Sequence, residues 1–128
     1  ARVEWLGFVP DLTAVQRRCS GFVAALRHGG GSKLKVLEAM AAGLPLVSTR
    51  QGASGLAIQP EQHYLAGETA EDLAEAIVRL LNQPTLAAQL AAAAREYARN
   101  VHDWAVAGNE LEHIYRNLPI HQEHHQCA

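Results

Sequence analysis

The segment from Arg27 to Lys33 has the residue types that best suit binding of an anion in this 128-residue chain. It stands between a short apolar run and a helical pattern that begins at Leu34. Glycines without a Cβ let the backbone approach a phosphate closely, and a helix N-terminus adds unpaired N–H groups with partial positive charge. Ser32 adds a hydroxyl group and Lys33 adds a full positive charge. The segment therefore predicts a binding site for a diphosphate, although its three glycines alone fit a flexible turn equally well.

The glycine run differs from the two common phosphate-binding motifs. No Gly-Lys-Ser/Thr sequence ends it, so it is not a P-loop, and Leu34 occupies the last glycine position of Gly-x-Gly-x-x-Gly. His28, directly before the glycines, is equally consistent with a neighbour of the ligand and with an ordinary loop histidine.

Glu38 is a second candidate for ligand binding, separate from the glycine-rich segment. It falls in the first half of the predicted helix 34–42, among apolar neighbours. A carboxylate at this place can accept hydrogen bonds from two vicinal hydroxyls, as on a ribose. Taken alone, a glutamate at such a position more often faces solvent, so both interpretations stay open at this point.

The elements that must position these residues alternate along the first half of the chain. Short apolar runs predict strands at 3–8, 22–26 and 45–49, with a further short strand at 64–66, and helical patterns fall at 12–18 and 34–42. This order predicts an α/β fold with a parallel sheet and Rossmann-like, right-handed crossovers. We expect strands 3–8, 22–26 and 45–49 to be adjacent in that order. Ligands of such sheets bind beyond the carboxyl ends of the strands, where the glycine loop would lie.

Helices dominate the second half of the chain. Thr69 and Asp72 resemble a capping pair, and helical patterns follow to Leu81, from Pro84 to about residue 100, and over 104–118. We expect residues 1–118 to form one domain and the polar residues 119–128 to form a flexible tail. The chain begins directly on a predicted strand, which suggests a piece of a larger protein.

Composition excludes several classes of function. The chain is 48% hydrophobic and 19% charged, with a net charge of −2, so nothing indicates binding of nucleic acid. It contains no apolar run of membrane-spanning length and no visible signal peptide. Cys19 and Cys127 do not form a secreted disulfide framework, so we expect a cytoplasmic setting, with peripheral membrane contact left open.

A metal site in the tail is one alternative. Its residue types are suitable, but the spacing is compressed and favours a flexible tail, so we expect no metal. The residues concerned are His121, His124, His125 and Cys127.

Residues 31–49 closely resemble the signature of the retaining glycosyltransferases of family 4, the "group 1" glycosyltransferases. Residues 6–11, 52–56 and 72–81 also fit that family. The resemblance implies a GT-B fold, in which this chain matches the later half of the C-terminal, donor-binding domain. It implies a nucleoside diphosphate sugar as substrate, no cofactor, and an acceptor glycan or lipid bound by an N-terminal domain. We therefore expect the chain alone to be inactive and to self-associate through exposed apolar surface.

The resemblance also assigns roles to residues. Glu38 matches the second glutamate of the motif Glu, seven residues, Glu, and would hold the ribose hydroxyls. Gly30 stands where the first glutamate is expected, so the sugar contact and the catalytic residue stay unassigned. The remaining donor-binding positions implied by the resemblance are the backbone of Gly31, Ser32, Lys33 and Leu34 against the sugar and diphosphate, and Gly7, Phe8 and Val9 at the base.

Two other functions remain compatible with the same residues. One is a catalytically inactive GT-B homologue, with Gly30 as the mark of lost activity. The other is an epimerase that acts on a nucleotide sugar.

Overall fold

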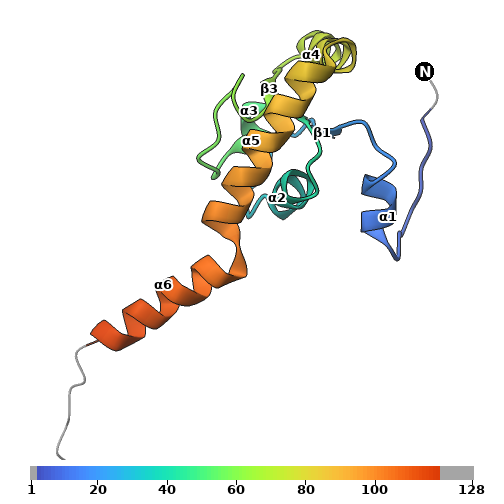
Figure 1. Ribbon diagram of the computed structural model, residues 1–128. Coiled ribbons are helices and arrows are strands. Elements are labelled where there is room, and N and C mark those ends of the chain that lie inside the picture. The colour runs from blue at the N-terminus through green and yellow to red at the C-terminus, as the bar shows by residue number, and fades with distance from the viewer. Residues whose placement is uncertain (1–2, 119–128) are drawn as a thin grey trace, which may run out of the picture.

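A computed structural model describes residues 3–118 of the chain (Figure 1). Three strands and six helices are formed within these residues: one helix precedes the first strand, two separate the strands, and the last three follow them. The strands are β1 (Phe22–Ala24), β2 (Leu46–Ser48) and β3 (Leu65–Ala66). The helices are α1 (Leu12–Gln16), α2 (Leu34–Ala41), α3 (Arg50–Ala53), α4 (Ala70–Asn82), α5 (Pro84–His102) and α6 (Trp104–Asn117).

The three strands form one parallel sheet in the order β1-β2-β3. Phe22 pairs with Leu46 between β1 and β2, and Val47 pairs with Leu65 between β2 and β3. The predicted α/β class and the parallel pairing of segments 22–26 and 45–49 are confirmed, although both strands are shorter than predicted.

The predicted strand at 3–8 is wrong. These residues form no strand, and the side chains of Val3, Trp5 and Phe8 are about nine-tenths exposed. A strand needs a neighbouring strand for its backbone hydrogen bonds. The alternation of apolar and polar side chains in residues 3–8 does not identify that neighbour. Strands that follow one another in sequence need not pair in a doubly wound sheet. Within the described residues β1 pairs with β2 alone, and β3 completes the sheet on the other side of β2.

The core lies on both faces of β2. Leu46 and Val47 are almost completely buried, and consecutive side chains of a strand point to opposite faces. Leu46 belongs to a cluster with Val36 and Met40 of α2 and with Ala94 and Ala98 of α5. Val47 belongs to a second cluster with Leu65, Ala76, Leu80 and Leu90, which joins the sheet to α4 and the start of α5. The helices thus hold β2 in place from both sides, and the loops after the strands are positioned by this core.

Local signals set most helix ends. The capping box of Thr69 and Asp72 at the start of α4 is confirmed, and Pro84 is the first residue of α5 as predicted. Gly43, with φ of +78°, ends α2, because glycine adopts this left-handed conformation without steric cost. Helix α1 is shorter than the predicted 12–18 and ends at Gln16.

Helix α6 projects from the rest of the molecule (Figure 1). Trp104 is 91% exposed, and Ile114 and Tyr115 are also exposed. Self-association through such surfaces stays a prediction. Among residues 3–118, no helix has the length and apolar character needed to cross a membrane.

The predicted flexible tail 119–128 and the alternative metal site within it lie outside the described residues. Between residues 3 and 118, no group of three or more His, Cys, Asp or Glu side chains is arranged to hold a metal ion.

Candidate functional site

The loops that follow the three strands meet at one edge of the sheet and are bonded to one another. Thr49, directly after β2, donates from Oγ1 to the carbonyl oxygen of Leu26 at 2.6 Å. The N–H of Arg50 donates to Oε1 of Glu68, which follows β3, at 2.9 Å. Parallel sheets bind ligands at this carboxyl edge. The structure therefore brings the glycine loop to the place where a ligand is expected.

The glycine loop is anchored at one carbonyl group. The carbonyl oxygen of Gly29 accepts a hydrogen bond from Nζ of Lys33 at 3.3 Å and another from Nε2 of Gln51 at 2.5 Å. Lys33 as a whole residue is only 9% exposed, and the bond from its Nζ to Gly29 holds its charge close to the loop. Gly29 and Gly31 have φ of +136° and +104°, values that favour glycine.

The loop presents free donors to open space. In the part of the chain that the structure describes, the backbone N–H groups of residues 30–33 donate to no protein acceptor. Lys33 stands at the N-cap of α2 but makes no capping hydrogen bond with its side chain. A Cβ placed on Gly30 would meet no atom within 4 Å, so the space beside the loop is open. Unpaired N–H groups at a helix N-terminus form a ready site for an anion.

The charge around the loop also favours an anion. Between residues 25 and 53 the chain carries four basic residues and one acidic residue, Glu38. The four basic residues are Arg27, Lys33, Lys35 and Arg50, of which Arg50 forms an ion pair with Glu68, outside this segment. A local excess of positive charge attracts phosphate groups and stabilises them once they are bound.

Glu38 lies on the exposed side of α2. It lines a hollow of about 410 Å³ between α1 and α2, together with Leu12, Thr13 and Gln16. Ala41 and Ala42, at the C-terminal end of α2, complete its lining, and no residue of the glycine loop is part of it. The assignment of Glu38 to the ribose stays a prediction.

The three residues predicted at the base, Gly7, Phe8 and Val9, lie on the other side of α1. Phe8 and Val9 line a separate hollow of about 400 Å³ with Val15 of that helix. Gly7 has φ of +63°, which turns the backbone before this hollow. The structure therefore does not bring these residues into the hollow of Glu38.

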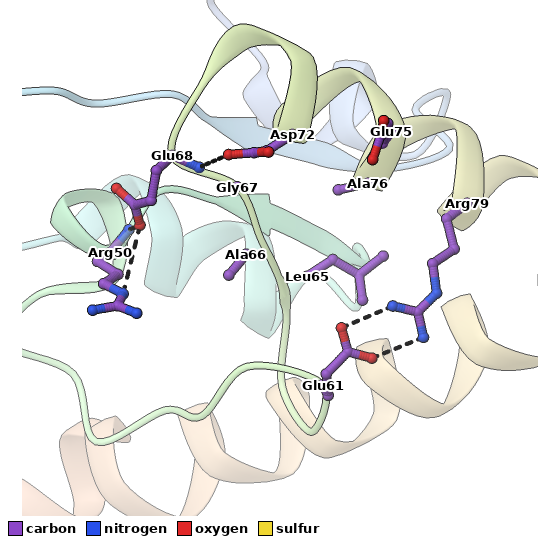
Figure 2. Close-up of a pocket in the computed structure, with 10 residues that line it drawn as sticks. All are labelled: Arg50, Glu61, Leu65, Ala66, Gly67, Glu68, Asp72, Glu75, Ala76 and Arg79. Carbon is purple, nitrogen blue, oxygen red and sulfur yellow. Dashed lines mark hydrogen bonds and ion pairs between the residues drawn. The ribbon is translucent and has the colours of Figure 1, made fainter.

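A third hollow runs beside β3 and α4 (Figure 2). It has a volume of about 340 Å³, and each of its two basic side chains is paired with a carboxylate. Figure 2 shows Arg79 reaching down to Glu61, and its Nη1 and Nη2 each donate to one carboxylate oxygen at 2.8 Å. Arg50 lies beside Glu68. This compensation leaves little free positive charge, so the glycine loop is the better site for an anion.

Two pKa values beside this hollow are shifted. Hydrogen bonds from the backbone and side chain of Thr69, and then from the Glu68 N–H, hold the pKa of Asp72 below its usual value of 3.8. Burial, followed by the nearby charge of Glu68, raises the pKa of Tyr64 above 10.0. Both groups therefore keep their ordinary charge at neutral pH.

Sequence analysis did not identify Gln51 or Thr49 as part of this site. Each bonds to a carbonyl more than twenty residues away in sequence. The sole sequence signal is their place at the end of the predicted strand 45–49 or just beyond it, where ligand-binding loops of parallel sheets are found.

The sequence matches the family model described as "Glycosyl transferases group 1" over residues 1–83. A D-inositol 3-phosphate glycosyltransferase of Rhodococcus opacus is 32% identical over 123 residues, which are 94% of this chain and 27% of that protein. The chain spans about a quarter of the length of the curated relatives it matches.

Two solved structures have a similar fold. The sucrose-phosphate synthase of Thermosynechococcus elongatus aligns with a TM-score of 0.69 and 26% identity, covering 80% of this chain and 26% of that one. The C-terminal domain of a group 1 glycosyl transferase from Francisella tularensis aligns with a TM-score of 0.68 and 22% identity, covering 77% of this chain and 53% of that one. The second likeness concerns the fold alone.

Proposed function

This chain belongs to the group 1 glycosyl transferases, and from that premise we propose that it binds the nucleoside diphosphate sugar donor of a retaining family 4 enzyme. The observation that carries the proposal is the set of unpaired N–H groups at residues 30–33, at the start of α2 and beside the buried charge of Lys33. Such donors suit a diphosphate, which is the leaving group of this transfer.

We propose further that the chain forms the later half of a C-terminal donor domain. The order β1-β2-β3 fits strands 4, 5 and 6 of a doubly wound sheet, and the unpaired segment 3–8 fits strand 3, whose neighbour is strand 2. The acceptor, a glycan or a lipid, would then bind to a separate N-terminal domain of a cytoplasmic enzyme. On this proposal the chain alone transfers no sugar, because only one wall of the cleft is present.

Each part of the site has a defined task in the proposal. The loop N–H groups, the α2 dipole and Lys33 stabilise the negative charge that develops on the departing diphosphate. Glu38 holds the ribose hydroxyls, and the segment Gly7–Val9 contributes to the base pocket. The reaction draws on no cofactor and no metal ion, and the residue that contacts the transferred sugar stays unassigned.

A catalytically inactive homologue is the second candidate. Gly30 favours it, because the resemblance places a glutamate at this position near the donor sugar. Turnover of a nucleotide sugar by the full-length protein separates the two candidates: the active enzyme releases nucleoside diphosphate in the presence of acceptor, and the inactive homologue binds the donor without turnover.

The experiment that tests donor binding is an NMR titration of the isotopically labelled chain with UDP and GDP. We expect saturable shifts of the backbone amides of residues 30–33, since their N–H groups meet the phosphates. Uridine and guanosine, which lack the phosphates, should leave these amides unchanged. If neither nucleoside diphosphate shifts them at millimolar concentration, the glycine loop is not a diphosphate site.

A further inference from the structure

Gln51 is a polar side chain at the carboxyl edge of the sheet, and the proposed function assigns it no task. It is the second residue of α3, and its Nε2 reaches across to the carbonyl oxygen of Gly29, twenty-two residues earlier, at 2.5 Å. Because a carbonyl only accepts, the amide of Gln51 must present its NH₂ group to the loop. Nζ of Lys33 donates to the same oxygen. One carbonyl of the glycine loop is thus held by side chains from two different elements.

The bond from Gln51 fixes more than one atom of the loop. The peptide group is planar and trans, so the N–H of Gly30 points opposite to the carbonyl of Gly29. That carbonyl faces Gln51 and Lys33, and the N–H of Gly30 therefore faces away from both, where no protein acceptor lies within the described residues.

A run of three glycines would otherwise sample many backbone conformations, because glycine lacks the steric limits of other residues. Fixing each residue in one conformation costs conformational entropy. A donor that had to order the loop on binding would lose part of its affinity to that cost. A loop that is already ordered removes the cost.

We propose that Gln51 is a positioning residue, which holds the Gly29–Gly30 peptide so that the N–H of Gly30 is directed at the diphosphate of the donor. The inference rests on the proposed function. Gln51 itself does not touch the donor. It acts through Gly29, as part of the ordered surroundings that keep a binding group in its productive orientation.

The first test measures the loop without any ligand. Gln51→Met removes the donor group and keeps a side chain of similar length. We expect the ¹⁵N order parameters of Gly30 and Gly31 to fall from the range of rigid backbone, about 0.85, toward 0.6 or below. Gln51→Lys returns an N–H donor at this position and should restore them. Gln89→Met, on the exposed side of α5, is the matched control and should leave the loop unchanged.

The second test measures affinity for the nucleoside diphosphates. We expect Gln51→Met to weaken binding of UDP or GDP by roughly threefold to tenfold, as for loss of one hydrogen bond, and Gln89→Met to have no effect. Binding of the nucleosides without phosphates should not change, because the loop contacts the phosphates alone.

The outcomes separate this inference from the function on which it rests. Unchanged order parameters in Gln51→Met overturn the positioning role, and so does a loosened loop with unchanged affinity. A third outcome is a loosened loop in Gln51→Met together with a wild-type chain that binds neither UDP nor GDP. Gln51 then orders the glycine loop, but the proposed function is wrong, and so is the role of Gln51 in donor binding.

Discussion

Gly52 packs directly on the hydroxyl group of Ser48. A Cβ on Gly52 would lie well inside van der Waals contact with Ser48 Oγ and 2.6 Å from the carbonyl oxygen of Ala24. Ser48 is completely buried, and its single hydroxyl proton is shared between the carbonyl oxygens of Thr49 at 2.9 Å and Ala24 at 3.3 Å, so neither neighbour can move away freely. We expect Gly52→Ala to destabilise the chain by about 1–3 kcal/mol, measured as the free energy of unfolding in urea.

Gly108 offers the matched control for that substitution. It lies in the middle of α6, and a Cβ there would meet no atom within 4 Å. Since alanine favours a helix over glycine by about 0.5–1 kcal/mol, Gly108→Ala should be neutral or stabilising. Equal effects at both glycines would show that the contact with Ser48 is not what requires glycine at position 52.

Asp72 should make stability depend on pH in the acid range. Hydrogen bonds from Thr69, and then from Glu68, hold its pKa below 3.8 in the folded chain. A carboxylate with a lowered pKa contributes stability above its unfolded pKa, and that contribution is lost as pH falls through the folded pKa. We expect wild type to lose stability from roughly pH 5 downward more steeply than Asp72→Asn. Urea unfolding at several pH values measures this.

Glu75 of the same helix provides the control for the acid dependence. Within the described residues it forms no hydrogen bond or ion pair, so Glu75→Gln should follow the wild-type curve. Parallel curves for wild type and Asp72→Asn would contradict the assignment of the effect to the capping box.

Tyr97 joins the end of α5 to the chain before β3. Its hydroxyl oxygen accepts a hydrogen bond from the N–H of Ala57 at 2.9 Å and lies 3.1 Å from Nε2 of His102. Tyr97→Phe keeps the ring and removes these bonds, so we expect a loss of about 0.5–1.5 kcal/mol in unfolding free energy. Tyr115→Phe, on the exposed face of α6, should change it by less than about 0.5 kcal/mol. If both substitutions cost the same, the hydroxyl of Tyr97 does not stabilise the fold.

Features that depend on neighbours in sequence were predictable. Thr69 and Asp72 of the capping box are only three positions apart, and the start of α5 is marked by a single residue, Pro84. The strand at 3–8 was predicted wrongly because its alternation of side chains shows two faces but not a pairing partner. Pairing is a contact between distant segments, and in a doubly wound sheet the nearest strand in sequence need not be the nearest in space.

The candidate site also has a part that the sequence could indicate and a part that only the structure reveals. The glycines, Lys33 and the start of α2 follow one another in sequence, so this part of the candidate site could be proposed from composition and spacing, and its binding of an anion stays a prediction. The bond from Gln51 to Gly29 spans twenty-two residues and depends on β1 and β2 ending at the same edge. No local pattern marks such a residue, and only the three-dimensional structure brings it to the loop.

Glu38 is the residue whose substitution tests the ribose assignment most directly. A carboxylate that accepts hydrogen bonds from two hydroxyls makes charge-assisted bonds, and losing one costs about 1.5–3 kcal/mol. We therefore expect Glu38→Gln to weaken binding of UDP or GDP by roughly tenfold to a hundredfold. Because Glu38 is exposed, the same substitution should change unfolding free energy by less than about 0.5 kcal/mol.

Calorimetric titration of each nucleoside diphosphate into wild type and Glu38→Gln measures the effect. Glu96→Gln, on the exposed side of α5, removes the same charge far along the chain from the glycine loop and should bind as wild type does. The 2′-deoxy nucleoside diphosphates add a second control, because they lack one of the two hydroxyls. If Glu38 holds both hydroxyls, they should bind wild type more weakly and lose less from Glu38→Gln than the ribonucleotides do. Equal dissociation constants for wild type and Glu38→Gln would instead leave Glu38 as a solvated residue of α2, and the diphosphate site at the glycine loop would stand without it.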